Sequence, residues 1–343
     1  MRVLITGGTG YVGAYAVQAL IAAGHTPRLL VRNPARVATT VGGLGVDLDV
    51  LEIAPGEMTD TAAITAALDG VEAVIHGAAV VAALNQADAA GAVETNVLGA
   101  KTVIDAALAA GCDPVVHISS VAALFTPTAP LLTADLAPAV NATSPYTKSK
   151  ALAEEFARAR QAEGAAVTIV YPGGVCGPAA GEVFGDVAEG FIAMLKPGLV
   201  PLSGGAIGVI DVRDLALVLA ATIVAGLGPR RFVAGGALVD MNEVGRLLRD
   251  ATGRRVPVVP LPGVVFRGLG RLMDQVRKVV PIDTVYSAEA MTLLTLARPT
   301  DDAAVHDQLG VTYRPVAETV EAMVRALYDA GRLTAKQVGA IAG

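Results

Sequence analysis

The sequence predicts an α/β fold, a doubly wound parallel sheet joined to a smaller, mostly helical C-terminal domain. Three observations support this prediction. Short aliphatic runs alternate with alanine-rich helical stretches over the first half of the chain. These runs are apolar on both faces, as in a parallel sheet that helices cover on both sides. A glycine-rich turn joins the first run to the first helical stretch.

The elements of the sheet follow one another at short intervals. We expect strands at residues 2–6, 27–31, 48–53, 73–76, 114–118 and 167–171. Helices are expected at residues 14–23, 61–68, 93–110 and 145–162. Gly24 and Gly111 are placed to end two of these helices, and Ser144 with Pro145 begins the last. Right-handed crossovers between such strands give a doubly wound sheet.

The strand–helix rhythm breaks after Pro172, where Gly and Pro become dense up to Gly208. A helix after Asp211 and a strand at residues 231–234 return to the sheet, and amphipathic helices with Pro-rich turns fill the remainder. We therefore expect a sheet domain of residues 1–174 plus 209–236. The second domain takes residues 175–208 plus 237–343.

Composition excludes several classes of protein. Apolar residues make up 53% of the chain and charged residues 17%, which favours a packed core over disorder. A net charge of −6 without a Lys/Arg cluster argues against nucleic-acid binding. The cysteines Cys112 and Cys176 and the four scattered histidines lack metal-ligand spacing, so no metal is expected. The longest apolar stretch, residues 215–228, is too short to span a bilayer, and no signal peptide is evident, so we expect a cytoplasmic protein.

The glycine turn follows the first strand and opens the first helix. Gly7 permits a sharp turn, Gly10 permits a pyrophosphate to approach the backbone, and Gly13 permits close packing of helix on strand. The amides at the helix N-terminus then face the phosphates. The pattern predicts a Rossmann-type dinucleotide site with contacts from Thr6, Gly7, Thr9, Gly10, Tyr11, Val12 and Gly13.

The residues after the second strand favour NADP over NAD. NAD sites usually place an acidic residue there to bind the adenosine ribose, but residues 14–46 contain no Asp or Glu. Arg32 stands at the end of the strand and Arg36 follows it. Arg32 is placed to bind a 2′-phosphate; the alternative is a solvated surface charge.

Two further motifs indicate proton transfer at a carbonyl. Tyr146 and Lys150 are four residues apart on the helix that begins at Pro145, so they share one face. A nearby ammonium lowers the pKa of a phenol and prepares it for acid–base catalysis. The fifth strand ends at Ser119 and Ser120, at the edge where ligands bind. Either hydroxyl can stabilise charge on a carbonyl oxygen.

The ordered set of glycine turn, Ser-Ser strand end and Tyr-Lys helix resembles the extended short-chain dehydrogenase/reductase superfamily. The resemblance covers most of the chain and is strongest over residues 1–215. It implies a Ser-Tyr-Lys catalytic group, with Ser120 as the serine and Lys150 also on the nicotinamide ribose. Asn96, in an Asn-Val-Leu-Gly motif, is implied to support the active site. Further implied cofactor contacts are Asp60 near the adenine, Ala78 and Ala79 in the cofactor wall, and Tyr171, Pro172, Gly173 and Val175 over the nicotinamide.

Two departures from the superfamily's motifs argue against a nucleotide sugar as the substrate. Tyr171 stands where the superfamily commonly has Arg, and Val-Ala-Ala-Leu-Phe125 replaces the Val-Tyr-Gly ending after the serines. The chain is more similar to the dihydroflavonol 4-reductase-like and 3β-hydroxysteroid dehydrogenase-like branch. That branch implies a ketone, aldehyde or alcohol of an apolar small molecule as substrate. The alternatives are a nucleotide-sugar epimerase or dehydratase with tightly held cofactor and, less favoured, a non-catalytic NADP-binding sensor.

Two interactions stay open from sequence alone. Residues 261–278 mix apolar and basic side chains, which fits a helix pair that covers the substrate cleft and, less favoured, a contact with a membrane surface. Analogy with the superfamily also suggests a homodimer.

Overall fold

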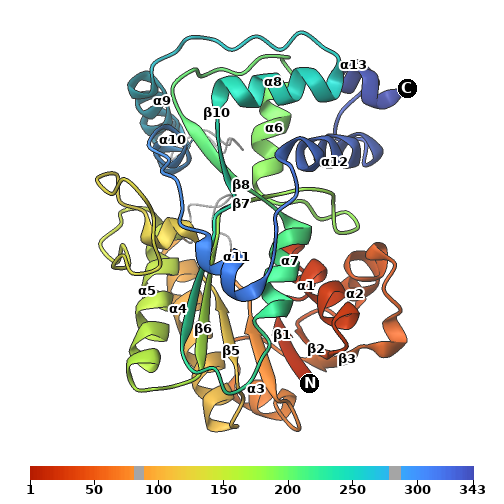
Figure 1. The fold of residues 1–343 in the computed structure, drawn as a ribbon, viewed down its shortest axis with the longest axis vertical. Coiled ribbons are helices and arrows are strands. Elements are labelled where there is room, and N and C mark those ends of the chain that lie inside the picture. Colours follow the sequence, from red (N-terminus) through yellow and green to blue (C-terminus); the bar gives the residue numbers. More distant parts are fainter. Residues whose placement is uncertain (81–88, 278–286) are drawn as a thin grey trace.

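The computed structural model describes residues 1–80, 89–277 and 287–343. Figure 1 shows a large sheet flanked by helices in the lower half and a smaller lobe above it, with the N-terminus at the bottom and the C-terminus at the top. The predicted fold class, a doubly wound parallel α/β sheet with a smaller, largely helical part, is confirmed.

The large sheet has seven strands in the order β3-β2-β1-β4-β5-β6-β9, and its strand pairs are parallel. Because the order reverses next to β1, the carboxyl ends of β1 and β4 form the switch point at which such sheets bind ligands. The strands are β1 (Arg2–Thr6), β2 (Thr26–Val31), β3 (Glu52–Pro55), β4 (Ala73–His76), β5 (Val115–Ile118), β6 (Val167–Pro172) and β9 (Arg230–Ala234).

Alternate side chains of each strand enter separate cores on the two faces of the sheet. In β1, Val3 and Ile5 pack under one helix layer, whereas Leu4 packs under the other. The first layer contains α1 (Tyr11–Ala22), α2 (Ala35–Thr40) and α7 (Val212–Ala221). The second contains α3 (Thr61–Ala67), α4 (Ala89–Ala109) and α5 (Pro145–Ala162). This alternation explains why the strands read as continuous apolar runs.

The third strand differs from the sequence prediction of residues 48–53. The carboxylate of Asp47 accepts a hydrogen bond from the backbone N–H of Asp49 and begins a single 3-10 turn at Leu48–Val50. Strand β3 therefore starts only at Glu52. Such local capping by Asp competes with extended structure.

The smaller lobe is built around a second sheet of order β10-β8-β7 and a core of its own. The sequence prediction missed this sheet, whose strands are short and lie among Gly and Pro residues. Its strands are β7 (Gly174–Cys176), β8 (Ala206–Asp211) and β10 (Ala237–Asp240). Its helices are α6 (Val187–Leu195), α8 (Met241–Thr252), α9 (Gly263–Val276), α10 (Ala288–Thr295), α12 (Val316–Asp329) and α13 (Ala335–Val338).

One C-terminal segment returns to the large sheet. Val305, in α11 (Ala303–Leu309), and Val311 are buried in the core beneath α1 and α7. Arg314 continues this contact, because its side chain pairs with Asp214 of α7 at 3.0 Å. The division of the chain into residues 1–174 plus 209–236 and 175–208 plus 237–343 stays a prediction.

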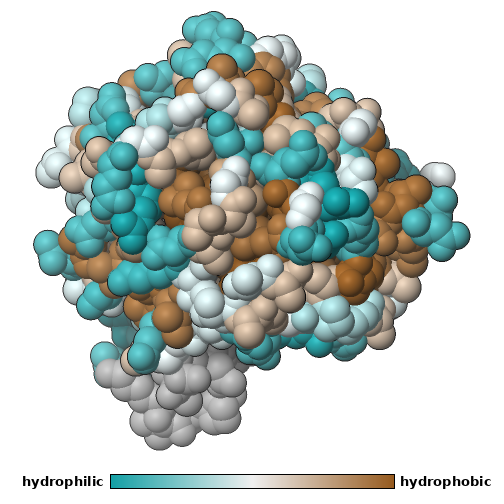
Figure 2. Space-filling model, turned by 90° about the horizontal axis from the view of Figure 1, so that it is seen from below, coloured by the Kyte–Doolittle hydropathy of each residue, from teal (hydrophilic) through white to brown (hydrophobic). Residues whose placement is uncertain are grey.

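The described part of the chain contains no helix that is both long and apolar enough to cross a membrane. Figure 2 views the molecule from the end at which the parallel strands begin. Hydrophobic areas on that surface are interrupted by hydrophilic residues. Surface hydrophobic residues scattered in this way need no functional explanation.

Candidate active site

The glycine turn has the geometry that a dinucleotide site needs. Gly7 has a φ of +78°, and a Cβ there would lie 2.8 Å from the backbone nitrogen of Ala78. A Cβ on Gly13 would collide with the carbonyl of Gly7. A Cβ on Gly10 would meet within 4 Å only that same carbonyl, at 3.2 Å, so its outer side is open. Gly10 is also the N-cap of α1 and makes no side-chain cap, which leaves helix amides free for a phosphate. These residues fit a dinucleotide.

Thr6 joins the glycine turn to the segment after β4. Its hydroxyl lies 2.7 Å from Nδ1 of His76 and accepts a hydrogen bond from the N–H of Ala78 at 3.2 Å. The side chain of Thr6 is therefore buried, and its hydroxyl contacts groups within the protein. Ala78 and the adjoining Ala79 are only partly buried, so they line the wall beside the turn.

Two buried histidines lie behind this wall. The rings of His76 and His117 stack with centroids 5.5 Å apart. Burial lowers the pKa of His76 to about 3 and the pKa of His117 well below its ordinary value. Both imidazoles are therefore neutral near pH 7, which agrees with a structural role. No group of metal-ligating side chains is found in residues 1–80, 89–277 and 287–343.

Ser120 and Tyr146 meet at the carboxyl end of β5. The Ser120 hydroxyl accepts a hydrogen bond from the N–H of Ala122 at 3.2 Å and caps a short 3-10 helix. Tyr146 lies in the first turn of α5, which Ser144 caps. Burial raises the pKa of Tyr146, and a hydrogen bond with the Ser120 side chain opposes that rise. The two hydroxyls can thus engage one carbonyl oxygen.

Lys150 lies one helical turn after Tyr146, as the spacing predicts. Its ammonium donates a hydrogen bond to the carbonyl of Ile118 at 3.0 Å. Burial lowers the pKa of Lys150 from 10.5 to about 8. The sequence argument expected Lys150 to lower the pKa of Tyr146, yet the pKa of Tyr146 is raised in this structure because burial outweighs the favourable contacts.

Asn96 connects α4 to the cofactor wall and to α5. Its Oδ1 accepts the N–H of Val80 at 2.7 Å, and its Nδ2 donates to the carbonyl of Val80 at 3.0 Å. Nδ2 also lies 3.4 Å from the hydroxyl of Ser149, which donates to the carbonyl of Tyr146. Asn96 therefore holds the chain after Ala79 against the helix that carries Tyr146 and Lys150.

Ser119 and Tyr171 belong to a separate buried network. The Ser119 hydroxyl donates to Glu154 at 3.0 Å, and Glu154 pairs with Arg158 at 2.6 Å. Arg158 also donates to the hydroxyl of Tyr171 at 3.1 Å. The side chain of Tyr171 is fully buried in the core beneath α3, α4 and α5. The side chain of Tyr171 belongs to this network, and the contact of residue Tyr171 with the cofactor stays a prediction.

The remaining predicted cofactor residues surround the same edge. Arg32 and Arg36 are exposed, and neither guanidinium forms an ion pair among the described residues. The carboxylate of Asp60 accepts the N–H groups of Ala62 and Ala63 and caps α3. Thr9, Val12, Gly173 and Val175 are partly buried, whereas Tyr11 and Pro172 are buried.

Two carboxylates near Tyr146 were missed by the sequence analysis. Asp186 and Glu289 both raise the pKa of Tyr146. Glu289, at the start of α10, accepts hydrogen bonds from the N–H and the hydroxyl of Thr147 at 3.3 and 2.7 Å. No motif marks either residue, because both come from the second lobe and reach the site only through the fold.

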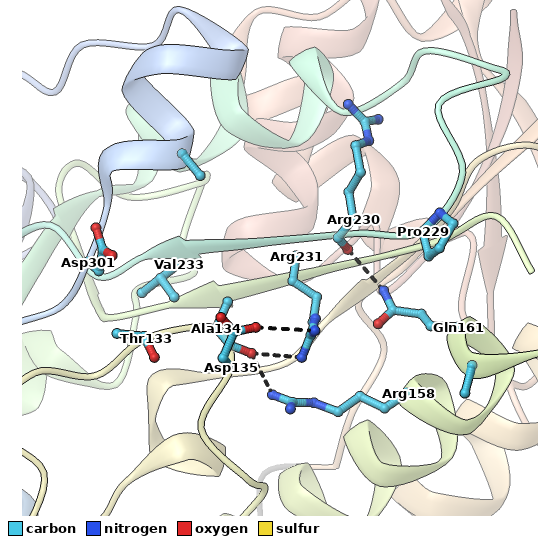
Figure 3. Close-up of a pocket in the computed structure, with 12 residues that line it drawn as sticks. Thr133, Ala134, Asp135, Arg158, Gln161, Pro229, Arg230, Arg231, Val233 and Asp301 are labelled. Carbon is cyan, nitrogen blue, oxygen red and sulfur yellow. Dashed lines mark hydrogen bonds and ion pairs between the residues drawn. The ribbon is translucent and has the colours of Figure 1, made fainter. Parts of the chain in front are cut away.

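A cavity of about 590 Å³ lies elsewhere, beside the edge strand β9. Figure 3 shows Arg158 and Arg231 pointing toward Ala134 and Asp135, while Arg230 points to the opposite side of the strand. Arg158 is neutralised by Glu154, and Arg231 pairs with Asp135 at 3.3 Å. The cavity does not include the Ser120–Tyr146 pair, so we place the candidate active site at the carboxyl edge of the sheet and not here.

Comparison of the sequence with known protein families agrees with the site that this geometry indicates. The sequence model of the NAD dependent epimerase/dehydratase family matches residues 3–235. The chain belongs to this family. It is an NAD(P)-dependent enzyme of the extended short-chain dehydrogenase/reductase type, and the resemblance that the motifs indicated is confirmed.

Several relatives and solved structures are similar to this family member over most of their length. It is 28% identical over 320 residues to sterol demethylase protein B of Methylococcus capsulatus, covering 91% of this chain and 93% of the relative. It is 26% identical to a Mycobacterium tuberculosis 3 beta-hydroxysteroid dehydrogenase/Delta 5-->4-isomerase, covering 78% and 73%. The structure of UDP-glucose-4-epimerase from Stenotrophomonas maltophila, which has NAD bound, superposes with a TM-score of 0.75 at 17% identity and covers 97% and 99%. That structural likeness supports the fold.

Proposed function

We propose that this enzyme is an NADP-dependent oxidoreductase that reduces a ketone or aldehyde of an apolar small molecule, or oxidises the corresponding alcohol. The observation that carries the proposal is the hydrogen-bonded pair of Ser120 and Tyr146, with Lys150 on the same face of α5. The pair stands at the same edge of the sheet as the glycine turn. Carbonyl reduction needs a proton donor at that edge.

Each side chain has a distinct task in this reaction. A nicotinamide dinucleotide, when bound, supplies the hydride. Ser120 donates a hydrogen bond to the carbonyl oxygen and stabilises the negative charge that develops on it. The hydroxyl of Tyr146 gives its proton to that oxygen. Lys150 supplies positive charge beside the phenol and, by family analogy, binds the nicotinamide ribose. The same groups acting in reverse oxidise an alcohol.

The choice of NADP follows from the end of β2. Arg32 and Arg36 leave two exposed guanidinium groups beside the expected adenosine, without an intervening carboxylate. Arg binds phosphate through paired N–H groups. We therefore propose that Arg32, with Arg36 near it, binds the 2′-phosphate of NADP. The residues proposed to hold the remainder are those of the glycine turn together with Asp60, Ala78, Ala79, Pro172, Gly173 and Val175.

An apolar substrate is favoured by the names of the relatives. Among the relatives are proteins named 3 beta-hydroxysteroid dehydrogenase/Delta 5-->4-isomerase and 2-alkyl-3-oxoalkanoate reductase. Within the family, a nucleotide-sugar epimerase or dehydratase remains the second candidate, because solved epimerases share the fold. A non-catalytic NADP sensor is less favoured because Tyr146 and Lys150 are both present.

The test follows cofactor absorbance with a panel of steroid, flavonoid-like and aliphatic carbonyls, using NADPH and NADH in turn. A reductase consumes the reduced cofactor in proportion to substrate, whereas an epimerase shows no net change.

Tyr146→Phe should lower turnover by about 100-fold or more while cofactor affinity stays the same. Tyr328→Phe, on α12 and distant from the site, is the matched control. Intact turnover in Tyr146→Phe would show that the proposed acid is wrong.

A further inference from the structure

Helix α9 presents an apolar face that the protein leaves uncovered. Val264 is 66% exposed and Leu272 is 58% exposed. Leu261, Val265 and Leu269 are exposed beside them, and we call these five residues the α9 outer face. The spacing 261, 264, 265, 269 and 272 places them on one stripe of a helix and the turn before it. Figure 1 shows α9 at the outer edge of the smaller lobe.

Positive charge borders this stripe. The exposed Arg271 follows Val264 by seven residues and therefore lies along one flank of the α9 outer face. The carboxylate of Asp274, the one acidic residue within α9, accepts the N–H of Ala288 at 3.1 Å and is turned to α10. The helix is thus locally basic in a chain whose net charge is −6. An apolar face with basic charge on its flank is typical of helices that lie in a membrane interface.

The opposite side of α9 is firmly attached to the protein. Phe266 and Gly270 are buried, and a Cβ on Gly270 would lie 2.7 Å from the carbonyl of Ser287. Arg267 donates to the hydroxyl of Thr295 in α10 at 2.9 Å. Helix α10 in turn reaches the candidate active site through Glu289, which binds Thr147 next to Tyr146. Helix α9 is therefore attached to α10, which contacts the site, and presents the α9 outer face to solvent.

We propose that the α9 outer face docks on the surface of a lipid bilayer that contains anionic lipids. The five apolar side chains enter the boundary between headgroups and acyl chains, and the exposed Arg271 lies at the lipid phosphates. The helix lies in the plane of the interface and does not span it. Docking would place the α9–α10 pair, which contacts the candidate active site through Glu289, at the phase in which apolar molecules concentrate. This inference goes beyond the proposed function, and its test measures lipid binding and not turnover, so the two can fail separately.

The test uses the full chain and sedimentation with vesicles. One vesicle contains phosphatidylcholine with an equal part of phosphatidylglycerol, and the other contains phosphatidylcholine alone. The protein should sediment with the anionic vesicles, and the neutral ones should bind it at least about fivefold more weakly. Val264→Ser with Leu272→Ser should lower binding to anionic vesicles about tenfold. Arg271→Gln should lower it about fivefold on anionic vesicles only.

The control removes two other apolar side chains that are also about half exposed. Leu217 and Leu227 are 47% and 53% exposed, and Leu217→Ser with Leu227→Ser should leave vesicle binding unchanged. Both double variants should unfold at the wild-type temperature, since every altered side chain is exposed. Absence of sedimentation with either vesicle overturns the proposal, as does an equal loss in the control. A wild-type dimer that Val264→Ser with Leu272→Ser converts to a monomer also overturns it, because the face then joins two copies of the chain.

Discussion

Asn96 pairs with both backbone groups of Val80, accepting its N–H at 2.7 Å and donating to its carbonyl at 3.0 Å. One amide side chain thereby fixes the chain just beyond Ala79 as a neighbouring strand would. Because Asn96 also reaches Ser149, the cofactor wall and the helix that carries Tyr146 share a common support.

Asn96→Ala should remove this support. The two backbone groups of Val80 lose their partners, which should lower the free energy of unfolding by about 1 to 2 kcal/mol. Displacement of the wall should lower turnover by about one to two orders of magnitude. Thermal unfolding and turnover measure the two effects. Thr102→Ala, which removes a hydroxyl bonded to Leu98 on the same helix, is the control and should change neither property strongly. Equal effects in the two variants would contradict the role assigned to Asn96.

The two neighbouring serines should behave differently when each is replaced by Ala. Ser120→Ala should lower turnover by about 100-fold or more, because the hydroxyl that contacts Tyr146 is lost. Ser119→Ala should leave turnover within a few-fold of wild type but lower the free energy of unfolding by about 1 to 3 kcal/mol, because the buried Glu154 loses a donor. The reverse pattern would make Ser119 the catalytic serine.

Lys150→Met should stabilise the fold while it abolishes turnover. Burial lowers the pKa of Lys150 from 10.5 to about 8, so its charge opposes folding at neutral pH. Removal of that charge should raise the free energy of unfolding by roughly 1 to 3 kcal/mol. Between about pH 8 and 10.5 the unfolded chain binds the extra proton, so wild-type stability should rise with pH there, and this rise should be absent in the variant. The exposed Lys148→Met is the control; equal stabilisation by it would contradict the assignment to burial.

The rate of carbonyl reduction should depend on the protonation of Lys150. The ammonium is present below about pH 8 and is lost above it. The pKa of Tyr146 is raised, so the phenol stays protonated through the same range. Turnover at saturating substrate should therefore be level up to about pH 8 and fall at higher pH. A profile that stays level to pH 10 would show that the charge of Lys150 is not required.

Arg32→Ala should change cofactor preference without loss of the fold. Loss of one guanidinium at a phosphate should weaken NADP binding by about tenfold or more, while NAD binding stays the same. Titration of both cofactors by calorimetry measures the ratio. Arg271→Ala, on the distant helix α9, is the control for loss of an exposed positive charge. Unchanged NADP affinity in Arg32→Ala would contradict the proposed phosphate contact.

The sequence alone determined the sheet and the glycine turn because both depend on local rules. Strand and helix periods are repeated in the order of the residues, and the positive φ of Gly7 and the close approach at Gly13 follow from their spacing. Tyr146 and Lys150 were likewise placed on one face by helical geometry. The third strand begins later than predicted because Asp47 caps a 3-10 turn through the N–H of Asp49. That contact spans only two residues, so the strand and helix periods of the sequence do not reveal it.

Only the tertiary structure decided which side chains meet across the fold. The Ser119 hydroxyl donates a hydrogen bond to Glu154, which is 35 residues away, so Ser119 and Ser120 have different partners. The hydroxyl of Tyr171 accepts a hydrogen bond from Arg158 within the core. Glu289 reached Thr147 from a helix 142 residues later. These contacts depend on how whole elements pack, and packing is set by the summed burial of many residues and not by a local pattern. For the same reason, the sequence showed only a mixture of apolar and basic side chains in α9. The structure was needed to show which of them are buried and which form the α9 outer face.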